Sequence, residues 1–201
     1  MKKIILGLLI VMSFYSNAQE TEFTFNNERG MTDFIVTPVE GKTAPEIYKK
    51  VIEWIKVTYK NPDKVILSTI ENEYVRFEGS SDKFYSINWG AELGGVIFED
   101  AKYQIEISIK NGKYKFDLIS IERYRKPTIF TSTVSIEGGW QDISESFSGH
   151  TSKESLKIVF DKDGVLNSIF INYPQVPIYF NNLNKSLSES IVSTVKKSDG
   201  W

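Results

Sequence analysis

The clearest pattern in the chain is a strict alternation of apolar and polar residues over positions 103–110. Aromatic or aliphatic residues occupy the odd positions and polar residues the even ones, which is the two-residue period of a half-buried strand. Asn111 and Gly112 follow, and this dipeptide favours a type I′ turn because both residues adopt positive φ readily. The alternation resumes over 113–124. The sequence therefore predicts an antiparallel hairpin across this region.

The returning strand of this hairpin contains an irregularity. Its apolar residues occupy one face up to Leu118, but Ile119 and Ile121 fall by alternation on the opposite, charged face. This predicts a β-bulge or a change of face. Apolar area left in water costs about 25 cal/mol per Å². We therefore expect residues 128–173 to fold back over this end of the sheet. Any ligand site is expected where this segment meets the sheet, near Tyr85 and Trp89.

A helix is predicted between Thr43 and Asn61. Thr43 and Glu46 have the spacing of a capping box, in which each residue can bond to the backbone of the other. Pro45 fits the first turn of a helix, where its missing N–H is harmless. Apolar residues then recur at three- and four-residue spacing, which predicts a helix lying on a sheet. They are Ile47, Val51, Trp54 and Ile55. The Asn-Pro dipeptide at 61–62 is expected to end the helix.

A second amphipathic helix is predicted near the C-terminus. Its apolar positions also recur at helical spacing, and they are Phe180, Leu183, Leu187, Ile191 and Val195. Asn181 or Asn182 is the expected N-terminal cap, because a short amide side chain can accept an otherwise unpaired amide of the first turn.

The remaining apolar runs predict short strands. They lie at 34–39, 65–70, 74–78, 84–89 and 128–136. Residues 156–160 and 165–173 flank a turn sequence at 161–164, so they predict a further β-hairpin, which Pro174 and Pro177 are expected to end. One helix among the strands and one after them indicate the α+β class.

The first residues have the three parts of a secretory signal peptide. Lys2 and Lys3 precede an apolar run at 4–11, and small residues at 16–18 precede Gln19. The apolar run is shorter than the roughly 20 residues that span a bilayer. We therefore expect residues 1–18 to be cleaved and 19–201 to form a single α+β domain in the periplasm or outside the cell, with 125–175 as a candidate β-rich insertion or extension.

Composition narrows the function classes. Loss of the signal removes two lysines and no acid, so the formal net charge changes from −2 to −4. A mildly acidic exported protein lacks the basic surface of a nucleic-acid binder. The sequence has no cysteine, so no disulfide and no lipid attached to cysteine is expected. No second apolar stretch approaches the length of a transmembrane segment.

Residues 34–122 carry a family resemblance. Its elements are the strand at 34–39, Gly41-Lys42-Thr43, a helix with Tyr48 and Trp54, Asn61-Pro62 before Val65-Ile66, and the hairpin around Asn111-Gly112. This arrangement resembles the domain of unknown function with a TATA-binding-protein-like fold found in secreted proteins of Gram-negative bacteria. The resemblance implies a curved antiparallel sheet with two helices on one face. It implies no activity, and the DNA binding of the fold's namesake is not expected here.

No motif in the chain commits it to a reaction. His150 lies in a polar stretch without the nucleophile and oxyanion donors of a triad. Asp161 and Asp163 favour a turn over a calcium loop, which would need a distal bidentate glutamate. The adjacent Glu99 and Asp100 could serve hydrolysis only if they lined a cleft. We therefore predict no catalytic residues, metal ligands or cofactor.

Aromatic residues near a glycine-rich stretch give the best candidate ligand site. Tyr85, Ile87 and Trp89 share one face of the strand predicted at 84–89, so they form either core or a binding surface. We take Tyr85 and Trp89 as candidate ligand-binding residues. The expected function is an exported, non-enzymatic binding or interaction module of the cell envelope, whose partner is a small apolar ligand, a glycan or an envelope protein. The alternatives are a hydrolase with dispersed carboxylates and a purely structural envelope domain.

Overall fold

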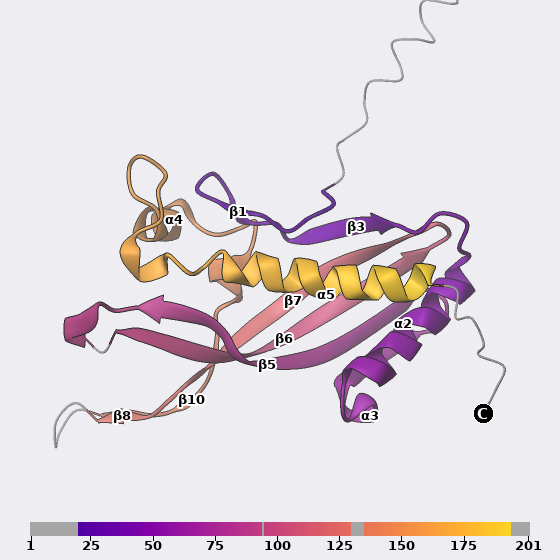
Figure 1. Ribbon diagram of the computed structural model, residues 1–201, viewed down its shortest axis with the longest axis horizontal. Coiled ribbons are helices and arrows are strands. Elements are labelled where there is room, and N and C mark those ends of the chain that lie inside the picture. Colours follow the sequence, from indigo (N-terminus) through magenta and orange to yellow (C-terminus); the bar gives the residue numbers. More distant parts are fainter. Residues whose placement is uncertain (1–19, 94, 130–134, 194–201) are drawn as a thin grey trace, which may run out of the picture.

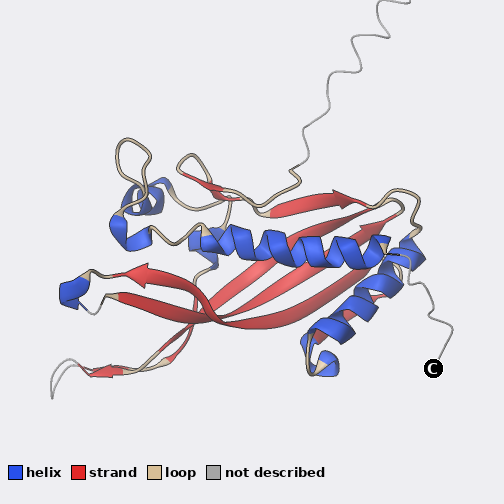
Figure 2. Cartoon of the chain, in the orientation of Figure 1, coloured by secondary structure: helices blue, strands red, loops and turns tan. Residues whose placement is uncertain are grey.

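A computed structural model describes residues 20–93, 95–129 and 135–193. Figures 1 and 2 show a curved sheet with helices against it. The strands are β1 (Phe25–Asn26), β2 (Gly30–Met31), β3 (Phe34–Pro38), β4 (Ile66–Ile70), β5 (Tyr74–Asn88), β6 (Val96–Lys110), β7 (Lys113–Arg125), β8 (Thr128–Ile129), β9 (Ser135–Ile136) and β10 (Gly139–Asp142). The α-helices are α2 (Ala44–Thr58), α3 (Pro62–Val65), α4 (Lys153–Val159) and α5 (Gln175–Val192), and the short 3-10 helices are η2 (Ala91–Leu93), η3 (Ser144–Phe147) and η4 (Ser168–Phe170).

The main sheet is antiparallel throughout. Its order is β10-β7-β6-β5-β4, and β3 pairs with β7 as well. β3 occupies the stretch of β7 from Lys113 to Asp117, and β10 occupies the stretch from Glu122 to Arg125. The hairpin predicted around Asn111 and Gly112 is confirmed, since β6 and β7 pair from Lys110 and Lys113 outward. The α+β class with a curved antiparallel sheet is therefore confirmed.

The strands predicted separately at 74–78 and 84–89 are one long strand, β5. Its pairing with β6 shifts between Ser81 and Tyr85, and Lys83 within the shift has a φ of 52°. A β-bulge of this kind increases the local twist and bends a strand without ending it. The two predicted strands therefore continue into each other, and the far end of β5 leaves the rest of the sheet.

The irregularity predicted in β7 is a bulge at Ile119. Ile105 pairs with Leu118 and Gln104 with Ser120, so Ile119 is the extra residue. The bulge turns Ile121 into the core, whereas Ile119 stays partly exposed on its own. The prediction that Ile119 and Ile121 share the charged face is therefore wrong. The predicted return of the 128–173 segment to this end of the sheet is confirmed at Ile143, whose amide donates to the Ile121 carbonyl over 2.9 Å.

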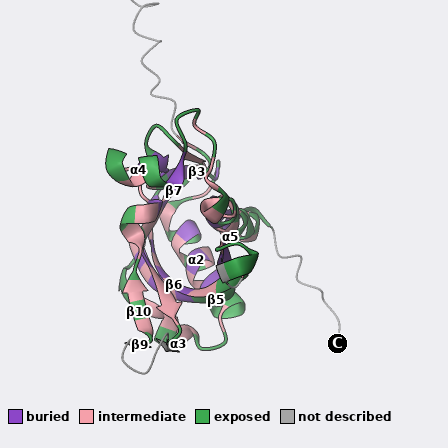
Figure 3. Ribbon diagram, turned by 90° about the vertical axis from the view of Figure 1, so that its left-hand side faces the viewer, coloured by how far each residue is buried: buried purple, intermediate pink, exposed green. Residues whose placement is uncertain are grey.

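Two helices lie on the concave face of the sheet, as the family resemblance implies (Figure 1). α5 runs along the sheet, and α2 lies across the sheet near the C-terminal end of α5. Figure 3 shows buried residues between the helices and the strands. The Trp54 indole N–H donates to the Ser186 hydroxyl over 3.1 Å, which joins the two helices. The capping box predicted from Thr43 and Glu46 is present at the start of α2, where the Glu46 carboxylate accepts the Thr43 amide over 2.8 Å.

The predicted β-hairpin over 156–173 is wrong. Residues 153–159 form helix α4, and one isolated bridge between Phe160 and Leu166 is the β pairing there. The turn at 161–164 is present, with the Gly164 amide donating to the Asp161 carbonyl over 3.1 Å. Helix α4 forms because Ser152 caps it by accepting the Ser155 amide, and because Leu156 and Val159 are buried one turn apart.

The cap predicted for the last helix is also wrong. α5 begins at Gln175, so Pro174 and Pro177 start a helix rather than end a hairpin. Asn181 lies inside α5, where its side-chain amide bonds to both backbone groups of Phe23. Val195, which was assigned to this helix, lies outside the described residues.

One hydrophobic cluster fills the space between the sheet and the helices. It includes Ile105, Ile107 and Phe116 from the strands and Phe180 and Leu187 from α5. Residues 140–173 add to the same cluster through Phe147, Leu156, Val159, Phe160 and Tyr173. Among the described residues, no helix has the length and apolar character needed to cross a membrane.

Candidate functional site

The far ends of β5 and β6 form a hairpin that projects beyond the other strands of the main sheet (Figure 1). The two strands pair there from Tyr85 with Glu99 to Asn88 with Val96. The hairpin continues past the last pair, since the Trp89 amide donates to the Gly95 carbonyl over 2.9 Å. A two-stranded ribbon in water has little stability of its own. This one is anchored by the buried residues at its base.

Large apolar side chains lie open to water on this hairpin. The exposed fractions are 44% for Trp89, 50% for Val96, 41% for Ile97 and 50% for Phe98. Val96 and Phe98 lie on one face of β6 and Ile97 on the other, because successive strand residues alternate. The ribbon is therefore apolar on both faces, whereas an ordinary surface strand is apolar on its core side.

The edge of β6 is also free along this stretch. β6 pairs with β7 from Asp100 onward, so Val96–Glu99 pair with β5 on one side and with no described strand on the other. A free edge presents backbone donors and acceptors that can bind a further strand. The apolar side chains and the open backbone thus occur together at residues 96–99. We call residues 96–99 with Trp89 the hairpin surface.

A polar cluster lies at the base of the hairpin surface. The Tyr85 phenol is buried near the Arg123 guanidinium, whose charge opposes the effect of burial on the Tyr85 pKa, and Arg123 donates to the Gln141 side chain over 3.3 Å. Glu99 pairs with Tyr85 and is half-buried beside the same arginine. Burial raises the pKa of the Glu99 carboxyl above its ordinary value, and this effect outweighs the opposing attraction of Arg123 and Arg125.

The structure separates the two residues predicted to bind a ligand. Tyr85 is buried and packs edge-on against Phe147 and Tyr173, with ring centroids 5.7 and 5.8 Å away. It therefore lies where the 128–173 segment meets the sheet, but its ring belongs to the core. Trp89 is exposed beyond it and belongs to the hairpin surface. The binding role proposed for the two residues stays a prediction.

The sequence prediction missed Val96, Ile97 and Phe98. The signal was present, because three successive apolar residues cannot all face one core in a strand, where side chains alternate. At least one of them had to point away from the core. Because these three apolar residues directly follow the glycine-rich stretch at 94–95, they could have indicated a hairpin whose end is apolar.

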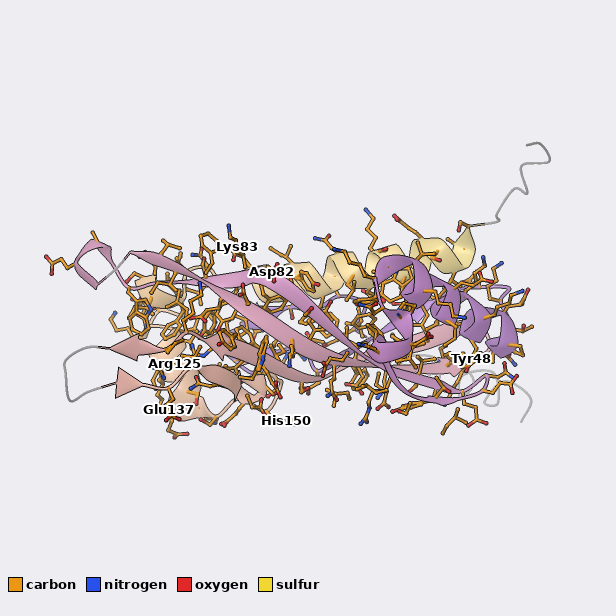
Figure 4. All side chains as sticks on the ribbon, turned by 90° about the horizontal axis from the view of Figure 1, so that it is seen from below. Tyr48, Asp82, Lys83, Arg125, Glu137 and His150 are labelled. Carbon is orange, nitrogen blue, oxygen red and sulfur yellow. The ribbon has the colours of Figure 1, made fainter. Side chains whose placement is uncertain are left out.

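The other candidate groups do not assemble into a reactive centre among the described residues. His150 is exposed and its Nε2 lies 3.7 Å from Asp33 Oδ2. Figure 4 places His150 on the opposite side of the molecule from Lys83 of β5. Glu99 and Asp100 are neighbours in β6, so they point to opposite faces and do not line one cleft.

No metal-binding constellation is present in the described part of the chain, where no three His, Cys, Asp or Glu residues cluster. The Asp161 carboxylate accepts the amides of Asp163 and Val165, each over 2.9 Å. This is the ordinary bonding of a turn aspartate. The described residues around 161–164 thus form a turn.

Comparison with known proteins supports the fold. A solved structure of a DUF4468 family protein from Bacteroides ovatus ATCC 8483 superimposes with a TM-score of 0.55 and 13% sequence identity, over 82% of this chain and 87% of the other. A TBP-like protein from Parabacteroides distasonis ATCC 8503 aligns with a TM-score of 0.48 and 13% identity, over 79% of this chain and 90% of the other. No family model and no curated protein sequence matches the chain. The chain therefore has the fold of a domain of unknown function, in agreement with the resemblance seen in its sequence.

Proposed function

We propose that this protein is an exported interaction module that binds an extended segment of a partner protein along the free edge of β6 at Val96–Glu99. One observation carries the proposal. The same residues combine an unpaired strand edge with side chains of Val96, Ile97 and Phe98 that are exposed on both faces of the strand. Strand addition uses these two features, since main-chain bonds give affinity and alternating side chains give specificity.

The geometry of the hairpin surface favours an added strand over a flat docking contact. A partner strand beside β6 would place its side chains alternately next to Phe98 and next to Ile97, and would cover apolar area on both faces of the ribbon. Trp89 lies close to the end of this edge and can serve as an aromatic anchor, a type of residue enriched at the centres of interfaces. Four paired residues give a small contact, which is typical of a transient interaction.

Charge at the hairpin end favours a protein partner over a lipid bilayer. Glu92 is exposed in η2, at the end of the hairpin. Insertion into a bilayer would carry its carboxylate toward the apolar layer, which is costly. Lys83 lies 5.8 Å from the centre of the Phe98 ring, so a cation already covers part of that ring on one side. A protein groove with polar rims accommodates both charges.

The predicted export agrees with the same function, because the signal pattern at residues 1–18 predicts a protein that meets other exported proteins. The rival proposal of a hydrolase needs two groups that converge in a cleft with shifted pKa values. Burial raises the pKa of Glu99, and the neighbouring carboxylate of Asp100 adds to this effect, but the two side chains point to opposite faces of β6 and so do not converge in one cleft. Binding is therefore the better supported function.

The experiment is site-specific photo-crosslinking in cells of the source organism. A photoreactive phenylalanine analogue replaces Phe98, and in the control it replaces Ile158, which is exposed on α4. We expect one defined protein adduct from position 98 and none from position 158. The identified partner is then purified, and its affinity is measured for wild type, Phe98→Ser and Ile158→Ser.

A loss of affinity of at least tenfold for Phe98→Ser alone would support the proposal. Three results would refute it. These are a crosslink to lipid instead of protein, an equal yield of adducts at both positions, and an identified partner that binds both serine variants as tightly as wild type. A crosslinked dimer of this chain would instead assign the edge to self-association.

A further inference from the structure

A group of lysines lies at the opposite end of the sheet from the hairpin surface. Lys110 and Lys113 form the last pair of β6 and β7 before the Asn111-Gly112 turn, so their side chains lie directly opposite each other on one face. Lys115 follows two residues later on the same face. The distance along β6 from Phe98 to Lys110 is about 40 Å, at about 3.4 Å per residue. This lysine group is therefore a separate surface.

The pairing of Lys110 with Lys113 is electrostatically unfavourable. Like charges directly opposite each other in an antiparallel pair destabilise the sheet. Neither lysine forms an ion pair within the described residues, and Lys115 is bonded to Asp117. The group thus carries more positive than negative charge, although the chain as a whole is acidic. A bound anion would remove the repulsion.

The lysines surround a hollow with an apolar wall. It has a volume of about 230 Å³ and is lined by Phe34, Val36, Ser108, Lys110, Lys113, Tyr114 and Lys115. Phe34 and Val36 come from β3 and lie beside Asp117 and Lys115 of β7, respectively. The Lys115 ammonium lies 5.0 Å from the centre of the Phe34 ring, which holds the cation at the edge of the wall.

We infer that this hollow binds a small organic anion, with its acidic group between Lys110 and Lys113 and its apolar part against Phe34 and Val36. The volume is below the roughly 300–1,000 Å³ of sites for drug-sized ligands, which limits the ligand to an acidic head and a few carbon atoms or one ring. A carboxylate, sulfate or phosphate accepts hydrogen bonds from lysine ammonium groups. The Ser108 hydroxyl lines the hollow and provides a neutral donor.

The test is to titrate the full mature protein with phenyl phosphate, inorganic phosphate and benzyl alcohol. Calorimetry measures the affinity of each probe, and changes in amide chemical shifts show where it binds. The first probe has both the acid and the ring, and the other two each have one of them. The test variant is Lys110→Gln/Lys113→Gln. The control variant is Lys153→Gln/Lys157→Gln, which removes the same charge from exposed positions on α4.

We expect phenyl phosphate to bind wild type more tightly than either other probe by at least threefold. The test variant should weaken this binding at least tenfold, and the control variant less than twofold. The test variant should also melt at the same temperature as wild type or higher, since it loses only a repulsive pair, so a loss of folding would contradict the inference. The Phe98→Ser variant should bind phenyl phosphate normally, which keeps this test independent of the proposed function.

Three results would overturn the inference. Equal weakening by both double variants would show a general effect of net charge. Equal affinity for inorganic and phenyl phosphate would show that the apolar wall takes no part. Chemical shifts that change elsewhere than in 34–36 and 108–115 would place the binding at another surface.

Discussion

The ring of Tyr103 lies directly over Gly79, its partner across β5 and β6. A Cβ atom built on Gly79 would lie 2.4 Å from two carbon atoms of this ring. The ring in turn is held in place, since the Tyr103 hydroxyl lies 2.7 Å from the hydroxyl of Tyr179 in α5. The absence of a side chain at position 79 therefore lets the Tyr103 ring lie against the β5 backbone while its hydroxyl reaches Tyr179.

Gly79→Ala is expected to destabilise the protein by about 1–3 kcal/mol, because the added methyl group overpacks a core that cannot open freely. Denaturant unfolding measures the change as a shift of the midpoint at constant slope. Gly112→Ala is an unsuitable control because its φ is 76°. Ser80→Ala, at an exposed neighbouring position, should change the free energy of unfolding by less than about 0.5 kcal/mol. Equal stability of Gly79→Ala and wild type would show that Tyr103 can move away.

Trp54→Ala should lower the free energy of unfolding by about 3–5 kcal/mol, as expected for a buried aromatic side chain cut to alanine. Trp54 is buried, its ring meets Phe77 edge-on at 5.8 Å, and it loses its bond to Ser186 in the variant. The matched control is Val57→Ala on the same helix, at a residue that is 87% exposed. A loss below about 1 kcal/mol for Trp54→Ala would contradict the packing of α2 against α5 and the sheet.

Much of the architecture was predictable from local pattern. The hairpin of β6 and β7 follows from strict alternation and from the Asn111-Gly112 turn, and α2 follows from its apolar spacing and from the pair of Thr43 and Glu46. These signals are strong because the residues that set each element are close in sequence. The resemblance of residues 34–122 added the two-helix layer, which periodicity alone does not place.

The errors occur where distant contacts override a local pattern. Residues 156–160 contain β-branched and aromatic residues that favour a strand. In the structure Leu156 and Val159, one helical turn apart, are both buried in the core, and this burial favours the helix over residues 153–159. The sequence pattern leaves Tyr85 open between the core and a binding surface, because two of its aromatic neighbours, Phe147 and Tyr173, come from far along the chain. The bulge at Ile119 in β7 was predicted from its apolar pattern, but the shift between Ser81 and Tyr85 in β5 was not, because the polar residues between them read as the end of a strand.

Stability should fall in alkaline solution. Burial raises the pKa of several phenols above the ordinary value of 10, and these belong to Tyr59, Tyr85, Tyr103, Tyr114 and Tyr173. The native state then keeps protons that the unfolded chain releases, so the free energy of unfolding decreases as the pH rises above about 10. Absorbance at the phenolate band should increase together with the loss of tertiary structure. Ionisation of all tyrosines near pH 10 in a protein that stays folded would contradict this.

Glu99→Gln should change the pH dependence on the acid side. The pKa of Glu99 is raised above 4.5 by burial, so the native state holds a proton on this group more strongly than the unfolded chain does. Wild type should therefore lose stability relative to Glu99→Gln as the pH rises upward from 4.5 through the raised native pKa. Unfolding free energies of both proteins from about pH 4 to about pH 8 measure the difference. A change of the opposite sign would show that Arg123 and Arg125 dominate the environment of Glu99.

The most direct measurement on the proposed function is backbone hydrogen exchange at Val96–Glu99, in the free protein and in its complex with the partner found by crosslinking at position 98. An added strand uses the open backbone of β6, so the outward amides among these residues should exchange at least tenfold more slowly in the complex, and α4 should be unaffected. Unchanged exchange at 96–99 in a complex that protects another surface would contradict docking at this edge.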